Sequence, residues 1–314
     1  MYEPIIRRAA GLGALSGKTN DDTYEKAFAH CDVLIIGAGP AGLMAALTAA
    51  RAGADVILAD EDSQIGGRLL AETHEVDGQA GADWAAGVID ELNSMDNVRL
   101  MTRTTVTGAY DQGTYGALER VGHHRADRAG PRECFWRIVA KRSILCAGAL
   151  ERPIAFPNND RPGIMTAGAV RAYLNRWGVA PGQAITVFAN NDDAHRTAMD
   201  FIDAGVTVAG VIDSRADAVA LGEYPLFTGA KVIGTTGRHG LGSITIEHAG
   251  GTQEIKPDCL ALSGGWNPTV HLTCHMNGRP TWSDDLLSFV PTEGSVPGMS
   301  VAGAANGVFS TLGC

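Results

Sequence analysis

The chain has 314 residues, of which 45% are hydrophobic and 19% charged, and its net charge is −10. This length suits two medium domains, or one domain with an insertion, and a core that needs no disulfide or metal. The acidic balance argues against a nucleic-acid groove or an anionic membrane surface, and no continuous apolar run has the roughly 18 residues of a membrane helix.

The six cysteines form no CxxC pair, which disfavours a redox-active disulfide. The first 30 residues contain no recognisable export signal. We therefore expect a reducing, cytoplasmic setting. The stretch HLTCH at 271–275 has no second ligand pair to complete a metal site, so we expect no metal.

The first half of the chain predicts a strand–helix–strand unit followed by several short strands. Residues 1–30 are polar and irregular, and we expect an N-terminal extension there. Apolar runs bounded by glycine, a helix rich in small residues and a hairpin signal then predict a strand at 31–36, a helix at 40–52, a strand at 54–59, a turn at 111–114 and a strand at 142–149.

The second half predicts another such unit after a proline-rich connection at 151–163. Its elements are a helix at 166–177, a strand at 184–189, a helix near 193–204, a strand at 206–212 and a β meander at 241–255. Two late strands, at 259–265 and 299–307, end in glycine turns, and we expect both to return to the first unit.

Two strand–helix–strand units indicate an α/β protein with two Rossmann-like domains, the second inserted in the first. The expected division is an extension at 1–30, a discontinuous dinucleotide-binding domain at 31–150 and 255–314, and an inserted domain at 151–254.

The stretch VLIIGAGPAGLM, residues 33–44, carries the pattern G-x-G-x-x-G between a predicted strand and a predicted helix. Gly37 permits the tight turn, Gly39 lets a pyrophosphate approach the backbone, and Gly42 lets the helix pack against the strand. The helix begins at Pro40 and Ala41, and its N-terminus offers free N–H groups to phosphates. This context favours a dinucleotide site.

Acidic residues follow the next predicted strand. A carboxylate at Asp60 or Glu61 would accept hydrogen bonds from ribose hydroxyls and repel a 2′-phosphate, which favours NAD or FAD over NADP. The alternative is a solvated loop. Gly66 and Gly67 would let the loop pass over the dinucleotide, and Arg68 would then meet a phosphate or lie on the surface.

The corresponding turn of the second unit, ANNDDA at 189–194, has no glycine. Asn190 and Asn191 carry side chains where a phosphate would sit. Asp192 and Asp193 would stabilise the helix N-terminus but repel a pyrophosphate. We therefore expect no second dinucleotide and no self-contained NAD(P)H-dependent reductase. The second unit is expected to serve packing or a partner surface.

These motifs, with MYEPIIRRAAGLG, VILADEDSQIGGRLL, DRPGIMTAGAVRAYLNRWGVAPG, VFANND and LSGGWNPTVHL, resemble the α subunit of heterotetrameric sarcosine oxidase. That family belongs to the two-dinucleotide-domain flavoproteins, with a glutathione-reductase-like fold. The resemblance covers essentially the whole chain but only the middle of such a subunit. A ferredoxin-like region before it and a folate region after it are missing, which implies a fragment, a truncated product or a split subunit.

The resemblance implies that NAD lies at the glycine turn. It also implies a complex with β, γ and δ subunits, or with split α-subunit domains, that oxidises the amine sarcosine to glycine, formaldehyde and hydrogen peroxide at flavins in or beside the β subunit. The cofactor contacts implied here by motif and resemblance are Gly37, Gly39, Pro40, Ala41, Gly42, Asp60, Glu61, Gly67, Arg68, Val106, Gly148, Gly303, Ala304, Phe309 and Thr311.

Two departures from the family pattern matter. Arg68 stands where the family has a small hydroxylic residue. Ala304 stands where FAD-binding members carry an aspartate, which favours NAD over FAD. The alternatives are an FAD-dependent amine or imino-acid dehydrogenase subunit and a non-catalytic scaffold.

No convincing catalytic acid, base or nucleophile emerges from the sequence. We expect His195 to be solvated, and His271 and His275 to share a helix face with a packing role. The stretch GGWNP at 264–268 would line the nucleotide site or form a tight turn. The tryptophans expected in the core or at an interface are Trp84, Trp136, Trp177 and Trp266.

Overall fold

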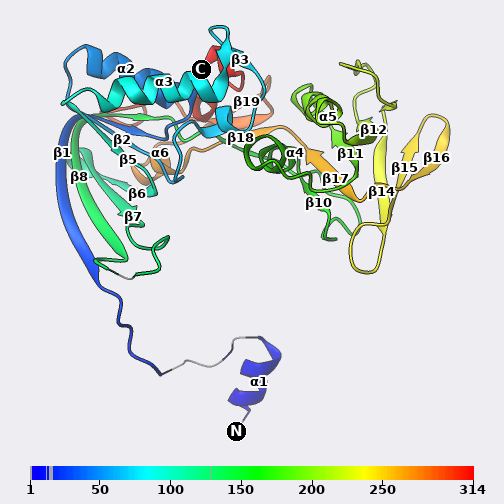
Figure 1. The fold of residues 1–314 in the computed structure, drawn as a ribbon, viewed down its shortest axis with the longest axis horizontal. Helices are drawn as coiled ribbons and strands as arrows, with labels where there is room; N and C mark the ends of the chain where they lie inside the picture. Colours follow the sequence, from blue (N-terminus) through cyan, green and yellow to red (C-terminus); the bar gives the residue numbers. More distant parts are fainter. Residues whose placement is uncertain (1, 12, 14–16, 128) are drawn as a thin grey trace.

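The computed structural model describes residues 2–11, 13, 17–127 and 129–314. It shows two units, each built on its own sheet, and a short N-terminal helix, α1 (Glu3–Ala9), that lies apart from both (Figure 1). No helix within these ranges is long and apolar enough to cross a membrane.

The first unit is built on a seven-stranded sheet in the order β5-β2-β1-β8-β7-β6, with β21 beside β8. Strands β5, β2, β1, β8 and β21 are parallel, and β7 and β6 are antiparallel additions. The bounds are β5 Val98–Met101, β2 Val56–Ala59, β1 Tyr24–Ile36, β8 Glu133–Leu145, β7 Thr114–Glu119, β6 Thr104–Tyr110 and β21 Met299–Val301.

Helices α2 (Pro40–Arg51) and α3 (Gly81–Asn93) cover one face of this sheet (Figure 1). Leu43 of α2 and Leu92 of α3 are fully buried with Leu58 of β2 in one cluster. The many alanines of α2 let the helix lie close to the sheet, because they add little side-chain bulk between the two backbones. The predicted hairpin is confirmed, since Tyr110 pairs with Thr114 across the 3₁₀ turn η2 (Asp111–Gly113).

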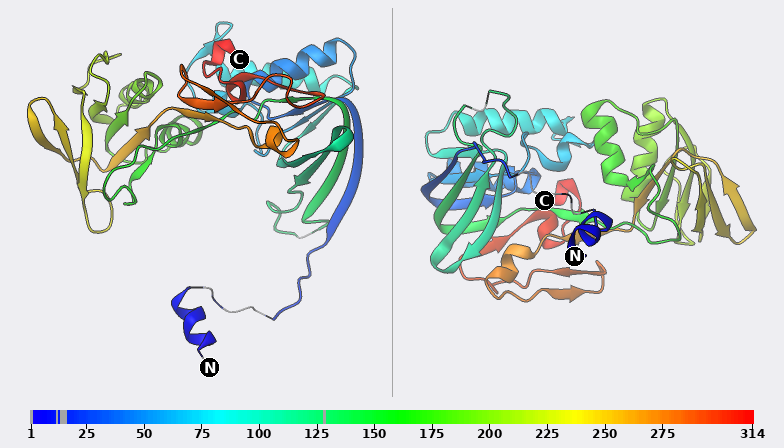
Figure 2. Two further views of the ribbon diagram at one scale, coloured as in Figure 1. Left: turned by 180° about the vertical axis from the view of Figure 1, so that it is seen from behind. Right: turned by 90° about the horizontal axis from the view of Figure 1, so that it is seen from below.

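Strand β1 begins earlier than predicted. It starts at Tyr24, not at residue 31, and pairs with β8 from Tyr24↔Glu133 to Ile36↔Leu145. Its first half extends beyond the helix-covered part of the sheet (Figure 2), and Phe28 is 68% exposed. The apolar run that guided the prediction marks only the buried half of the strand. The exposed half is held by pairing with residues more than a hundred positions away.

The second unit is built on a five-stranded parallel sheet in the order β10-β17-β11-β12-β13. Phe201 of α5 is fully buried against the Val187 side of this sheet. The meander predicted at 241–255 is present as the antiparallel sheet β14-β15-β16, but it begins ten residues earlier, with β14 at Lys231. The bounds are β10 Ile164–Thr166, α4 Ala167–Arg171, a π turn Ala172–Arg176, β11 Ala184–Ala189, α5 Asp193–Asp203, β12 Thr207–Asp213, β13 Leu226–Thr228, β14 Lys231–Thr236, β15 Ser243–His248, β16 Gly251–Ile255 and β17 Cys259–Ser263.

The expectation that both late strands return to the first sheet is wrong for β17. This strand lies between β10 and β11 in the second sheet, whereas β21 joins the first. All five residues of β17 are buried, as in any central parallel strand. Such an apolar run does not indicate which of the two sheets the strand will join.

The chain passes between the units twice, and the two crossings meet as the antiparallel pair of β9 (Ala149–Glu151) and β18 (Trp266–Pro268). Helix α6 (His271–His275) then packs on β6. The remaining short elements are η1 Gly67–Leu70, β3 Glu75–Val76, β4 Gln79–Ala80, β19 Thr281–Ser283, β20 Ser288–Val290, η4 Gly303–Asn306 and η5 Thr311–Gly313.

Candidate functional site

The three glycines of the first turn differ in the space that surrounds them. A Cβ on Gly37 would lie 2.4 Å from the Cys146 carbonyl oxygen, and Gly37 has a φ of 97°. A Cβ on Gly42 would lie 1.9 Å from the Gly37 carbonyl oxygen. A Cβ on Gly39 would meet no heavy atom within 4 Å. The first and third glycines are therefore required by the fold itself, and the second faces open space.

Helix α2 begins at this open space without a side-chain cap. Its N-cap is Gly39, Pro40 follows, and the first turn holds no acidic residue. The N–H groups of a helix N-terminus carry a partial positive charge. The arrangement fits an anionic group such as a pyrophosphate, which the missing Cβ of Gly39 leaves room to approach.

A cavity of about 640 Å³ opens beside this turn. It is formed by the ends of β1, β2 and β8, by β6, by η1 and by the C-terminal segment. The predicted contacts that line it are Gly37, Gly39, Pro40, Ala41, Asp60, Glu61, Gly67, Arg68, Val106, Gly148, Ala304 and Phe309. Residues drawn from six places in the sequence thus meet around one space.

Three predicted contacts do not line the cavity. Gly42 is buried beneath the turn. A Cβ on Gly303 would lie 2.6 Å from the Cβ of Ala41, so this glycine holds the C-terminal segment against α2. The Thr311 hydroxyl donates to the Glu72 carboxylate at 2.8 Å. All three residues lie outside the cavity and support the segments that form its wall.

The two acids after β2 have different surroundings. Asp60 accepts the N–H of Ala38 at 2.6 Å and that of Asp62 at 2.8 Å, so it ties the end of β2 to the glycine turn. Burial raises the pKa of Asp60 above its usual range, against the lowering effect of these N–H donors. Glu61 is exposed, and among the described residues its carboxylate has no hydrogen-bond or ion-pair partner. Glu61 is the free acceptor at this end of the cavity.

Arg68 is neither a free phosphate ligand nor a surface arginine. Its guanidinium forms an ion pair with Glu72 and another, at 3.2 Å, with Asp193 of the second unit. It also donates to the Phe309 carbonyl at 3.2 Å and lies 5.1 Å from the centre of the Trp266 ring. The arginine bridges three segments at the cavity wall.

Sequence reasoning missed part of the lining. We expect a packing role for His271 and His275, yet both line the cavity, and His275 Nδ1 accepts the Ala109 N–H at 3.5 Å. Trp266 also lines it, one of the two alternatives for GGWNP. The i, i+4 spacing correctly placed both histidines on one helix, but only the packing of α6 on β6 brings them to the cavity.

The glycine-free turn of the second unit is filled by its own side chains. Asn191 Oδ1 accepts the Ala194 N–H at 3.2 Å and caps α5, a role the sequence assigned to the aspartates. Asp192 pairs with Arg215 at 2.7 Å. The N-terminal positions that side chains leave open at α2 are thus taken by side chains at α5.

The expectation that His195 is solvated is wrong. Its side chain is 1% exposed and lies between Asp213 Oδ2 at 2.8 Å and the Tyr224 hydroxyl at 2.9 Å. Burial alone would raise the pKa of Asp213, but hydrogen bonds from His195 and Arg215 outweigh it and lower this pKa to about 2. A histidine two positions after the first residue of a helix gives no sign, from the sequence alone, of which helix face it occupies.

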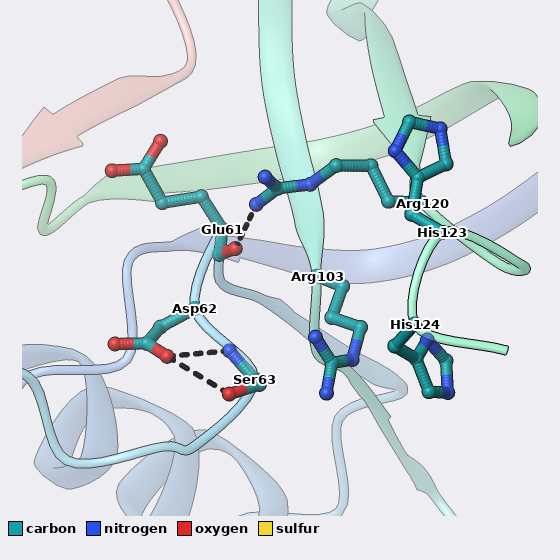
Figure 3. A pocket seen from close by; sticks show the side chains of 7 residues that line it. All are labelled: Glu61, Asp62, Ser63, Arg103, Arg120, His123 and His124. Carbon is teal, nitrogen blue, oxygen red and sulfur yellow. Dashed lines mark hydrogen bonds between the residues drawn. The ribbon is translucent and has the colours of Figure 1, made fainter.

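A second cavity, of about 650 Å³, adjoins the acid end of the first and shares Glu61 and Asp62 with it. Figure 3 shows the Glu61 carboxylate pointing away from the arginines, while Arg120 donates to the Glu61 carbonyl at 2.5 Å. The other lining residues are Ser63, Arg103, His123 and His124. The described ranges contain no cluster of three or more metal-ligating side chains.

Comparisons with known proteins agree with this architecture. Residues 32–129 match the model of a family described as FAD dependent oxidoreductase. Over the whole chain the sequence is 49% identical to the sarcosine oxidase subunit alpha of Rhizobium meliloti (strain 1021), covering 32% of that protein. It is 40% identical, over 96% of the chain, to that of Corynebacterium sp. (strain P-1), covering 33%.

Among solved structures, L-proline dehydrogenase from P. horikoshii superimposes with a TM-score of 0.70 at 22% identity, over 92% of this chain and 53% of that one. This likeness confirms the predicted two-Rossmann-domain fold. The sequence matches confirm the predicted resemblance: the chain is homologous to the sarcosine oxidase α subunit. It spans about a third of the length of these curated relatives.

Proposed function

We propose that this chain is the dinucleotide-holding part of a sarcosine-oxidase-like α subunit and binds one dinucleotide in the 640 Å³ cavity. The observation that carries the proposal is the convergence, around one cavity, of an uncapped helix N-terminus, an open Gly39 and a Glu61 carboxylate that no described residue pairs. At the start of α5, by contrast, Asn191 caps the helix and Asp193 places a negative charge in its first turn.

Each part of the cavity suits one part of a dinucleotide. The pyrophosphate would lie at Gly39 and the first turn of α2, where N–H groups stabilise its charge. Glu61 would accept the ribose hydroxyls, and Val106 would contact the adenine. The opposite end, at Gly148 and Trp266, would receive the nicotinamide or flavin ring. That ring would supply the capacity to accept a hydride, and the residues around it would orient it and exclude water.

Two observations favour different cofactors. Ala304 lines the cavity where an FAD site in this superfamily has a carboxylate, and this favours NAD, the cofactor we propose. The match of residues 32–129 to a family of FAD dependent oxidoreductases favours FAD, the second candidate. Glu61 would serve the ribose of either.

The deciding experiment is to purify the chain without added cofactor, denature it, and identify the released nucleotide by chromatography and mass spectrometry. NAD without flavin is the expected result. FAD would overturn the choice of cofactor while keeping the site. A protein that releases neither, and takes up neither NAD nor FAD in a titration, would overturn the site and favour a non-catalytic scaffold.

The activity of the larger assembly is part of the same proposal. The relatives are named as subunits of sarcosine oxidase, so we propose that this chain acts with further subunits or α-subunit segments in oxidising an N-methyl amine such as sarcosine. We also propose that the second unit extends from residue 151 through β17, and that the protein works in the reducing cytoplasm, where its six free thiols are stable.

A further inference from the structure

We propose that Asp193, in the glycine-free turn of the second unit, is a positioning residue for the dinucleotide site of the first unit. It acts by holding Arg68 in the cavity wall. The inference rests on the proposed function, because it assumes that a dinucleotide occupies the cavity. The second unit, whose own turn has no glycine, would thus contribute a residue to the dinucleotide site of the first unit.

Arg68 is anchored from three directions. It follows Gly67, whose added Cβ would lie 2.8 Å from the Cα of Gly39, so the arginine starts directly over the phosphate-facing turn. Glu72 fixes Nε from within the same segment, and the Phe309 carbonyl accepts from Nη1. The only carboxylate that the described residues place on Nη2 is Asp193.

Asp193 is itself held in place. Its side chain is 26% exposed and lies 3.7 Å from Arg171, which is buried and bonded to Asp200 at 2.7 Å. It also stands in the first turn of α5, where the helix dipole favours a negative charge. The carboxylate therefore occupies a fixed position at the junction of the two units, and its contact with Arg68 transmits that position to the cavity.

A fixed Arg68 matters because a free arginine side chain has many rotamers. Ordering it on binding costs free energy that a prearranged wall does not require. Arg68 also lies against Trp266, which lines the ring end of the cavity. Loss of Asp193 would loosen both side chains and let the dinucleotide leave more easily, so we expect a faster dissociation rate.

The neighbouring residue supplies a matched control. Asp192 carries the same charge in the same turn, but its side chain is 81% exposed and pairs with Arg215, not Arg68. The full chain, freed of nucleotide, is titrated with NAD and with FAD, and dissociation is followed by displacement. Asp193→Asn is expected to weaken binding of the accepted nucleotide about tenfold, as for loss of one charge-assisted hydrogen bond, and Asp192→Asn less than about twofold.

Two further variants separate positioning from a general structural defect. Asp193→Glu is expected to recover most of the affinity. The double variant Arg68→Gln/Asp193→Asn is expected to bind no more weakly than Arg68→Gln alone. Either change removes the same Arg68–Asp193 ion pair, so the second change has nothing further to remove.

Equal affinities of Asp193→Asn and Asp192→Asn would overturn the inference. So would tighter binding by Asp193→Asn, which would mean that Asp193 only repels the nucleotide. Additive losses in the double variant would also overturn it. If the wild-type chain binds neither nucleotide, the proposed function fails instead, so the two failures are distinguishable.

Discussion

At the scale of single residues, the glycine motif divides into positions required by the fold and one position that the fold leaves open. Gly37 and Gly42 have no room for a Cβ because backbone atoms lie too close. Gly39 has room, and its N-cap backbone, with φ −72° and ψ −172°, suits any residue. The structure alone therefore does not require a glycine at position 39.

This division predicts opposite behaviour for two alanine substitutions. Gly42→Ala should lower the free energy of unfolding by about 1–3 kcal/mol, because the methyl group would overlap the Gly37 carbonyl. Gly39→Ala should leave stability unchanged and abolish dinucleotide binding, because the methyl group would fill the phosphate approach. Urea denaturation without nucleotide measures the change in the free energy of unfolding, and calorimetric titration with nucleotide measures the change in binding. Equal loss of stability in both variants would contradict the division.

At the scale of elements, α2 and α5 follow corresponding strands, but their N-termini differ in capping and in charge. The start of α2 is open and uncharged. The start of α5 is capped by Asn191 and followed by a buried network in which Asp213 receives hydrogen bonds from His195 and Arg215. The network joins the start of α5 to the end of β12. Side chains of the protein itself therefore stabilise this edge of the second sheet, without a bound nucleotide.

This network predicts an acid-sensitive contribution to stability. The pKa of Asp213 is lowered from 3.8 to about 2 in the folded state. Its stabilising effect is therefore complete above about pH 4 and is lost as the pH falls towards 2. At pH 7, Asp213→Asn should cost about 3 kcal/mol, the usual cost of breaking a buried charged pair.

Urea denaturation from pH 7 to pH 3 tests this. The difference between wild type and Asp213→Asn should shrink below about pH 4. Asp217→Asn, which changes an exposed residue four positions further on, serves as the control and should cost little at any pH. A wild-type advantage over Asp213→Asn that stays constant down to pH 3 would refute the assignment.

At the scale of the whole molecule, polar side chains hold the two units together. Asp200 of α5 binds Arg171 at 2.7 Å and accepts the Thr73 hydroxyl of the first unit at 2.9 Å. Arg176 of the second unit pairs with Asp62 of the first at 2.6 Å. Asn175 donates to the Ala71 carbonyl at 2.9 Å. Such links fix the orientation of one unit relative to the other more than a featureless apolar contact would.

Asp200→Asn should therefore uncouple the units. Arg171 is 4% exposed and would keep only the more distant carboxylate of Asp193, at 3.7 Å, so we expect a loss of about 3 kcal/mol. Hydrogen exchange should show the second sheet opening before the first in Asp200→Asn, and we expect the two sheets to open together in the wild type. Asp203→Asn, at the exposed end of the same helix, is the control. Unchanged joint opening of both sheets in Asp200→Asn would contradict the role given to this junction.

Much of the fold and part of the site follow from local patterns. The glycine turn, the strand before it, the hairpin at 111–114 and the glycine-free second turn are readable because each depends on residues close together in sequence. The extension of β1 to Tyr24 and the placement of β17 were not readable, since both depend on pairing with distant strands. The burial of His195 was missed because its partners Asp213 and Tyr224 come much later in the chain.

The sequence by itself determined the glycine turn, the uncapped start of α2 and the glycine-free, acidic start of α5, because each of these features depends on residues within about one turn of backbone. Only the tertiary structure decided which residues share the cavity, that Arg68 is paired across the two units, and that Asp193 reaches it. Ion pairs and cavity walls join segments more than a hundred residues apart, and their partners are chosen by packing, which no local pattern encodes.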